Sequence, residues 1–266
     1  MKPDRIVTVC FSPTGTTRKI LEEIAKGVKI DTDKQIDLTL PAALAKDNII
    51  DRNDLALIGV PVYAGRVPGI AVQRLKTIKA DKTPAIIVVV YGNRDYEDAL
   101  LELSAIVKEA GFVPVAAGAF IGEHSFSNAD TPIAAGRPDQ QDMMRAQEFG
   151  AMAGKKIGDL YGFDADVFLP LPGKFPYKDY GAWPEMSPVV CEDICNLCGE
   201  CAAVCPTAAI MVDAAVQTDK KKCILCCACV KSCPLDARVM EEPAVRQIAE
   251  WLSATFRERK APDIFI

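Results

Sequence analysis

The 266-residue chain has no long apolar run, no strong net charge and a single histidine. Its longest apolar stretches, at 85–91 and 112–121, are the length of strands and too short to span a bilayer. The net charge of −5 is too small to suggest a nucleic acid or an anionic membrane surface as a partner. The apolar run after Lys2 and Arg5 is too short for a signal peptide, so we expect a cytoplasmic protein.

Cysteine, by contrast, is abundant and unevenly placed. Ten of the 11 cysteines lie between Cys191 and Cys233, and only Cys10 stands apart. In a reducing cytosol, a cluster of this kind indicates metal ligation rather than disulfide bonds.

Two cysteine runs repeat one spacing: Cys195-x2-Cys198-x2-Cys201-x3-Cys205-Pro206 and Cys223-x2-Cys226-x2-Cys229-x3-Cys233-Pro234. The first three cysteines of a run can present thiolates to one [4Fe–4S] cluster, while the fourth, carried away by the proline turn, ligates the other cluster. The expected ligands are therefore crossed between the runs. The first cluster takes Cys195, Cys198, Cys201 and Cys233, and the second takes Cys205, Cys223, Cys226 and Cys229.

These runs resemble the two-cluster bacterial ferredoxins over residues 190–240, with every ligand position matched. A zinc site is the alternative, but zinc is typically held by well-separated Cys-x2-Cys pairs with four ligands per ion. Cys191 and Cys227 are surplus to the expected ligands, and we interpret them as packing residues that could also tune a cluster. Cys10 is interpreted as a small buried hydrophobe in the first strand.

The first 160 residues alternate between strand-sized apolar runs and segments with helical periodicity. The predicted strands are 5–11, 35–40, 55–60, 85–91 and 112–121. The predicted helices are 16–28, 70–79, 96–110 and 140–160. This alternation predicts an α/β fold with a five-stranded, doubly wound parallel sheet.

A loop rich in hydroxyl groups follows the first predicted strand and opens a helix. Hydroxyl side chains and free N–H groups at a helix N-terminus form an anion site, and glycine lets the backbone approach the anion closely. No lysine follows at the position that a nucleoside triphosphate requires, so a phosphate monoester is favoured. The candidate residues are Ser12, Thr14, Gly15, Thr16 and Thr17.

This loop resembles the phosphate loop of the flavodoxins, and the resemblance implies a flavodoxin-like fold with bound FMN. In that fold the flavin lies at the carboxyl ends of the strands. The loops after the third and fourth strands would then flank the flavin ring, with Tyr63 and Tyr96 as the stacking aromatics. Arg66 and Arg94 either stabilise a reduced flavin or are solvated surface groups. The implied ring-binding residues are Pro61, Tyr63, Gly65, Gly92, Asn93 and Tyr96.

The remaining segments complete the expected division of the chain into domains. A flavodoxin-like domain at 1–165 is followed by a proline-rich linker at 166–190, which we expect to pack in part through its aromatic residues. The ferredoxin-like domain, a small α+β unit, covers 191–240. An amphipathic helix and a tail follow at 241–266, and we expect the helix to cover one of the domains. The linker aromatics are Phe168, Phe175, Tyr177 and Trp183.

The single histidine, His124, follows the fifth predicted strand, at the sheet edge that also carries the flavin loops. A lone histidine is usually structural. Its pKa near neutrality nevertheless makes it the candidate proton donor of a catalytic site.

Together the two halves resemble the flavodoxin–ferredoxin fusion family of anaerobic bacteria and archaea. Clusters pass single electrons, whereas a flavin holds one or two, so the resemblance implies electron transfer between two [4Fe–4S] clusters and FMN. Soluble electron donor and acceptor proteins would be the partners. The sequence leaves open whether the chain forms a homodimer. Two alternatives remain: a flavin-dependent reductase of a small organic substrate, and a ferredoxin on a docking domain without flavin.

Overall fold

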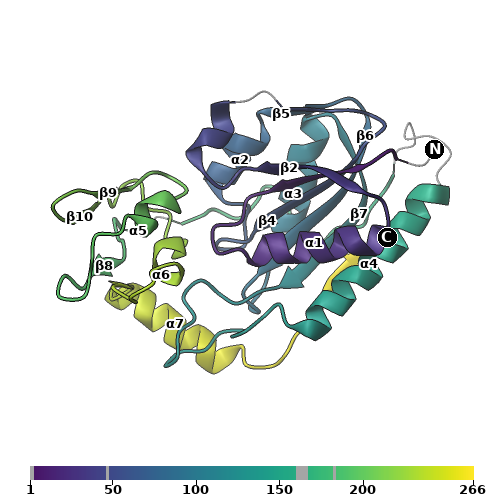
Figure 1. Ribbon diagram of the computed structural model, residues 1–266. Helices are drawn as coiled ribbons and strands as arrows, with labels where there is room; N and C mark the ends of the chain where they lie inside the picture. The colour runs from purple at the N-terminus through teal and green to yellow at the C-terminus, as the bar shows by residue number, and fades with distance from the viewer. Residues whose placement is uncertain (1–2, 46–47, 160–166, 182–183) are drawn as a thin grey trace.

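The protein is described here by a computed structural model that covers residues 3–45, 48–159, 167–181 and 184–266. It consists of two units (Figure 1). The α/β unit is formed by residues 3–159, with the large sheet at its centre. The cysteine unit, residues 187–240, lies beside the α/β unit on the left of the view, and helix α7 lies below it.

The large sheet has six strands in the order β12-β7-β6-β4-β1-β2. Five of them run parallel, and β12 pairs antiparallel with β7. The order of the five parallel strands is 2-1-3-4-5 along the chain, which is the flavodoxin-like order. The predicted fold class is therefore confirmed. The strands are β1 (Ile6–Cys10), β2 (Thr32–Asp37), β4 (Leu55–Pro61), β6 (Thr83–Tyr91), β7 (Phe112–Ile121) and β12 (Asp263–Phe265).

Helices cover both faces of this sheet, because its central strands are apolar on both sides. All nine residues of β6 are buried. One core cluster joins the sheet to α1 and α4, and a second joins it to α2 and α3. The carboxyl ends of the parallel strands meet at one edge, where the predicted flavin loops begin. The helices are α1 (Thr16–Val28), α2 (Gly69–Leu75), α3 (Ala99–Glu109) and α4 (Gln140–Asp159), with the 3-10 helix η1 at Pro41–Ala45.

The sixth strand is a difference from the five-stranded sheet that the sequence predicts. Residues Asp263–Phe265 pair with Ala117–Ala119 and cover the otherwise open edge of β7. A strand of three residues is too short to give a periodicity, so it was not predicted. The tail thus belongs to the α/β unit in space, and a small parallel pair, β3 (Asn48–Ile50) and β5 (Ile78–Ala80), lies outside the large sheet.

Helix α7 (Pro243–Thr255) covers the α/β unit, as its amphipathic pattern predicts. It buries Val245, Ala249 and Leu252, and the last two pack with Ile133 from the loop after β7. Among the described residues, no helix combines the length and apolarity needed to cross a bilayer.

The proline-rich linker packs through different residues from those predicted. Leu169 and Leu171 lie against the core of the α/β unit. Phe168 and Phe175 are 85% and 81% exposed, so their predicted packing is wrong. Tyr177 packs instead on a cation, the guanidinium of Arg66, and Trp183 lies outside the described residues.

The cysteine unit is built from very short elements. Two antiparallel ribbons, β8 with β11 and β9 with β10, flank two single-turn helices. Its fold is held by turns around the cysteines rather than by a large apolar core, as expected of a small domain that binds metal clusters. The elements are β8 (Val189–Val190), α5 (Glu200–Ala203), β9 (Ile210–Val212), β10 (Val216–Thr218), α6 (Ala228–Lys231) and β11 (Arg238–Val239).

Candidate functional site

Nine cysteines line two separate cavities in the cysteine unit, and eight of them are the expected cluster ligands. The first cavity is lined by Cys195, Cys198, Cys201 and Cys233. The second cavity is lined by Cys205, Cys223, Cys226 and Cys229, together with the surplus Cys227. The structure thus brings together the same two crossed groups of four that the spacing predicts.

The fourth cysteine of each run is held in the same way. The N–H of Ala209 donates to Sγ of Cys205, and the N–H of Ala237 donates to Sγ of Cys233, each at 3.2 Å. Both donors stand four residues after the cysteine that accepts. N–H groups that donate to ligand sulfurs stabilise the thiolate and tune a cluster. Each cavity therefore has one thiolate stabilised by the same backbone contact.

The donor sets suit iron–sulfur clusters chemically. Burial raises the pKa of Cys226 to about 12, and it also raises the pKa of Cys201, Cys223 and Cys229. Buried thiolates are therefore unstable in these cavities without positive charge nearby, which the iron of a cluster supplies. The four expected ligands in each cavity match the four ligands of one cubane.

The three surplus cysteines lie in different surroundings. Cys227 is buried and lines the second cavity. Cys191 is exposed before the first run. Cys10 lies buried in β1, where burial raises the pKa of its thiol to about 12, in agreement with its interpretation as a small hydrophobe.

The predicted phosphate loop joins β1 to α1. Ser12 Oγ accepts the N–H of Arg18 at 3.1 Å, and the Ser12 N–H donates to Thr39 Oγ1 at 2.9 Å. Gly15 has a φ of 82°, with open space where a Cβ would be. The buried Thr17 Oγ1 has no hydrogen-bond partner among the described residues. An open glycine turn and an unpaired buried hydroxyl at a helix N-terminus fit a bound phosphate.

Within the loop after β4, Tyr63 faces the cysteine unit. Burial raises the pKa of its phenol well above the usual value, and the charges of the nearby Cys226 and Cys227 thiolates raise it further. Gly65 has a φ of 82° and touches Glu97, and its carbonyl accepts the N–H of Asp98 at 3.1 Å. Pro61 ends β4 at the same edge. The loop after β4 therefore lies near Cys226 and Cys227, which line the second cavity.

In the loop after β6, two residues that were predicted to bind flavin form hydrogen bonds with the C-terminal segment instead. The Asn93 amide donates to the carbonyls of Phe256 and Glu258, both at 2.8 Å. The Tyr96 hydroxyl donates to Asp263 Oδ2 at 2.9 Å. These contacts do not favour the predicted flavin role of Asn93 and Tyr96. Gly92 lies against the ring of His124, which leaves no room for a larger side chain.

The ring of His124 is held by its surroundings. Its Nδ1 accepts the N–H of Phe126 at 3.1 Å, and the two rings pack edge to face. Burial lowers the pKa of His124 to about 4, and the charges of Arg94 and Lys231 act in the same direction. The imidazole is therefore neutral at pH 7, which does not favour its predicted role as a proton donor.

Arg66 is bound within the α/β unit rather than solvated. Its guanidinium makes two hydrogen bonds to Glu102, at 2.8 and 2.7 Å, and stacks on Tyr177 and Tyr180 of the linker. Arg94 pairs with Glu97. Arg66 therefore holds the linker on the α/β unit.

Arg74 connects the two units and was not predicted as a functional residue. It is 1% exposed on α2, and Nη1 donates to the carbonyls of Leu38 and Thr39 at 2.7 and 2.6 Å. Its Nη2 donates to the carbonyl of Pro206 at 2.5 Å. Since Pro206 follows Cys205, Arg74 fixes the second cavity to the α/β unit. An arginine in a helix gives no sequence signal of such a contact.

Two further contacts join the units at the second cavity. Ile224, which lines this cavity, packs against the core of the α/β unit. Lys231, two residues after Cys229, donates to Glu123 at 2.6 Å and to the carbonyl of Ser127 at 2.8 Å. The second cavity is therefore the one held against the α/β unit.

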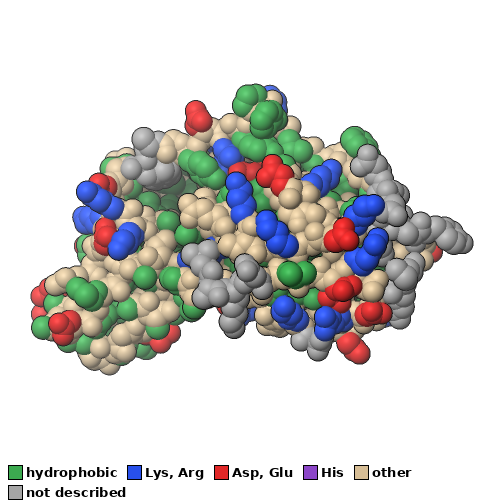
Figure 2. All heavy atoms as spheres, turned by 90° about the horizontal axis from the view of Figure 1, so that it is seen from above, with side chains coloured by type: hydrophobic (Ala, Val, Ile, Leu, Met, Phe, Trp, Pro, Cys, Tyr) green, Lys and Arg blue, Asp and Glu red, His purple; other side chains and the backbone are tan. Residues whose placement is uncertain are grey.

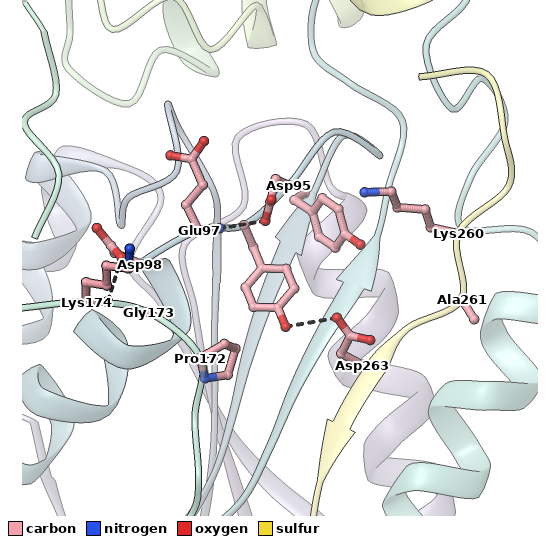
Figure 3. Close-up of a pocket in the computed structure, with 11 residues that line it drawn as sticks. Asp95, Glu97, Asp98, Pro172, Gly173, Lys174, Lys260, Ala261 and Asp263 are labelled. Carbon is pink, nitrogen blue, oxygen red and sulfur yellow. Dashed lines mark hydrogen bonds between the residues drawn. The ribbon is translucent and has the colours of Figure 1, made fainter. Parts of the chain in front are cut away.

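A larger cavity of 690 Å³ lies at the carboxyl end of β6, between the following loop, the linker and the C-terminal segment (Figure 3). Asp263 lines it from the C-terminal strand, and Lys174 lines it from the linker. Asp98 accepts the backbone N–H of Lys174 at 2.9 Å. The described residues that line this cavity include none of the loop 12–17, so it is separate from the predicted phosphate site.

Comparison with known protein families identifies one domain. Residues 187–234 match the profile of the 4Fe-4S dicluster domain, Fer4_10. This segment contains both cysteine runs and all eight expected cluster ligands. No curated protein sequence matches the chain.

Solved structures resemble the α/β unit. A flavodoxin from the domain Archaea has a TM-score of 0.38 and 12% identity, covering 58% of this chain and 99% of that chain. A flavodoxin of Streptococcus pneumonia TIGR4 has a TM-score of 0.36 and 14% identity, covering 58% and 97%. The rubredoxin oxygen:oxidoreductase of the anaerobe Desulfovibrio gigas has a TM-score of 0.37 and 13% identity, and this chain spans only 38% of it.

These scores are low, so the strand order of the large sheet identifies its fold. The dicluster match identifies the cysteine unit as an iron–sulfur domain, and such domains carry electrons. The chain combines a flavodoxin-like α/β unit with a 4Fe-4S dicluster domain, an arrangement consistent with a flavodoxin–ferredoxin fusion, and this combination supports a role in electron transfer.

Proposed function

We propose that the protein transfers electrons between two [4Fe–4S] clusters, one in each cysteine cavity, and an FMN whose phosphate binds at residues 12–17. When bound, FMN supplies a centre that exchanges one or two electrons, whereas each cluster exchanges one. Ser12, Thr14, Gly15, Thr16 and Thr17 hold the phosphate through hydroxyl and N–H groups. Pro61, Tyr63, Gly65 and Gly92 remain the candidates for the ring.

One chain of hydrogen bonds carries this proposal. The Ser12 N–H donates to Thr39 Oγ1, the Thr39 carbonyl accepts from Arg74, and Arg74 donates to the carbonyl of Pro206. The chain begins in the phosphate loop and ends beside Cys205, a predicted ligand of the second cluster. It supports an inner position for the second cluster, next to the flavin site.

The first cluster would then exchange electrons with other proteins. Leu197 and Leu235 line the first cavity and are 41% and 44% exposed, and Ile194, which precedes the ligand Cys195, is 51% exposed. The segments 191–201 and 233–237 contain four acidic residues and no lysine or arginine. In Figure 2 the cysteine unit lies on the left, and hydrophobic and acidic side chains are visible at its lower end.

An apolar patch with an acidic rim suits a soluble redox protein whose docking face is basic. Complementary charge accelerates the encounter of two such proteins, and the apolar patch excludes water at the contact. The partner is thus an electron donor or acceptor protein that docks at the first cavity. No nucleic acid or membrane takes part in this proposal.

The test is the visible spectrum of anaerobically purified protein, with iron quantified and flavin released by acid. The proposal expects about eight iron atoms per chain, four for each cluster, and FMN in the released fraction. Iron–sulfur absorbance without flavin, even after FMN is added, would overturn the flavin half and leave a ferredoxin on a docking domain.

A further inference from the structure

The side chain of Arg238 lies between the two cysteine cavities. It lines both of them. Its backbone is fixed in β11, where Arg238 pairs with Val190 of β8. Its Nη2 donates to Thr218 Oγ1 at 3.1 Å and lies 3.9 Å from Sγ of Cys229. One guanidinium therefore adjoins both predicted clusters.

This arginine is buried without a carboxylate. It is 3% exposed, and its Nε has no hydrogen-bond partner among the described residues. No Asp or Glu in the described part of the chain forms an ion pair with it. A buried, unpaired cation is costly, so a negative group must compensate for it when the protein is complete. A [4Fe–4S] cluster with four thiolate ligands is such a group.

Because the cysteine motif is duplicated, Arg238 can be compared with the equivalent residue of the other half. Arg238 stands five residues after Cys233, and Ile210 stands five residues after Cys205. In both halves the N–H of the preceding alanine donates to the cysteine sulfur. The next residue is a buried isoleucine in the first half and a buried arginine in the second. The fold therefore accepts an apolar side chain at this position, so packing alone does not require an arginine.

We propose that the buried charge of Arg238 raises the reduction potentials of both clusters and thereby tunes electron transfer through them. The inference rests on the proposed function, because it requires two clusters. Reduction adds one electron to a cluster, and a nearby buried cation stabilises the added charge. Because one cation serves both cavities, its removal lowers both potentials.

The experiment is an anaerobic redox titration of the iron-loaded full chain, followed by electron paramagnetic resonance (EPR), for the wild type, three Arg238 variants and one control variant. Arg238→Gln removes the charge but keeps a polar group. Arg238→Ile copies Ile210 of the other half. Arg238→Lys keeps the charge, and Lys221→Gln is the control that removes an exposed charge from the same unit.

We expect the Gln and Ile variants to keep full iron and to shift both midpoint potentials to more negative values. The Lys variant retains most of the wild-type potential, and Lys221→Gln leaves it unchanged. If Gln and Ile lose iron while Lys keeps it, the positive charge is required even for assembly, which supports the inference.

Unchanged potentials in iron-loaded Gln and Ile variants would overturn the inference, as would iron loss in all three Arg238 variants, because the residue would then act by its shape. A wild-type protein with fewer than two clusters would instead overturn the proposed function.

Discussion

The two cysteine cavities have the same four-cysteine design but different surroundings. The ligands of the second cavity include three buried cysteines, and its residues contact the α/β unit through Arg74 and Ile224. In the first cavity only Cys201 is buried, and apolar and acidic side chains around it face solvent. The two copies of the motif therefore differ in position: one cavity is inner, against the α/β unit, and the other is outer, near the solvent.

This difference gives the proposed electron path a direction. A centre that receives electrons from another protein must lie near the surface, whereas a centre that delivers them to a flavin must lie near the flavin loops. The first cavity lies near the surface and meets the first requirement. The second cavity meets the second requirement, because Arg74 connects it to the α/β unit.

The largest expected effect separates the two cavities. Cys233→Ala removes the fourth ligand of the first cluster, so about half of the iron should be lost while the second cluster stays. Iron quantitation and EPR measure this loss. Cys227→Ser, which changes a cysteine that is not an expected ligand, should retain full iron. Full iron in Cys233→Ala, or loss of the second cluster alone, would break the crossed assignment.

Next is the contact that holds the inner cavity. Arg74→Leu leaves the carbonyls of Leu38, Thr39 and Pro206 without their donor, and it should lower the free energy of unfolding by about 2 kcal/mol. Chemical denaturation measures this change. Arg145→Leu, at an exposed ion pair, should change it by less than about 0.5 kcal/mol. Equal effects of the two substitutions would contradict the bridging role.

The flavin site should respond independently of both cavities. Replacing Thr14 and Thr16 together by Val removes two hydroxyl groups from the phosphate loop and should weaken FMN binding by about 10- to 100-fold. Fluorescence titration of flavin-free protein measures the affinity, with iron content as the control. An unchanged affinity would show that the loop does not bind the phosphate.

The last prediction concerns pH. The pKa of His124 is about 4 in the folded protein against 6.5 for a free histidine, so the folded state binds fewer protons than the unfolded state between these values. Its contribution to stability is present above pH 6.5 and is lost as the pH falls toward 4. Since the chain has one histidine, NMR can follow its ring signal directly. A titration midpoint near 6.5 would contradict the buried, neutral state.

The sequence predicted the features that repeat locally. Strand and helix periodicity indicated the parallel sheet, because β4, β6 and α1 carry long regular patterns. The cysteine spacing predicted the two groups of four, since the motif itself determines which sulfurs a turn presents.

Features that depend on distant contacts were not predictable. Arg74 meets Pro206 across 132 positions of the chain, and Asn93 meets the tail across 163. β12 has three residues and forms only because the edge of β7 is open to it. Phe168 and Phe175 were expected to pack because they are apolar, but the short leucines of the linker take the core positions.

The central claim is that electrons move between the inner cluster and the flavin within one chain. The direct measurement is rapid-mixing spectroscopy after less than one equivalent of reductant is added anaerobically, following the iron–sulfur and flavin absorbance at several protein concentrations. The account predicts that electrons redistribute between the two absorbing centres at a rate independent of protein concentration. A rate proportional to concentration would show exchange between molecules and contradict the internal path.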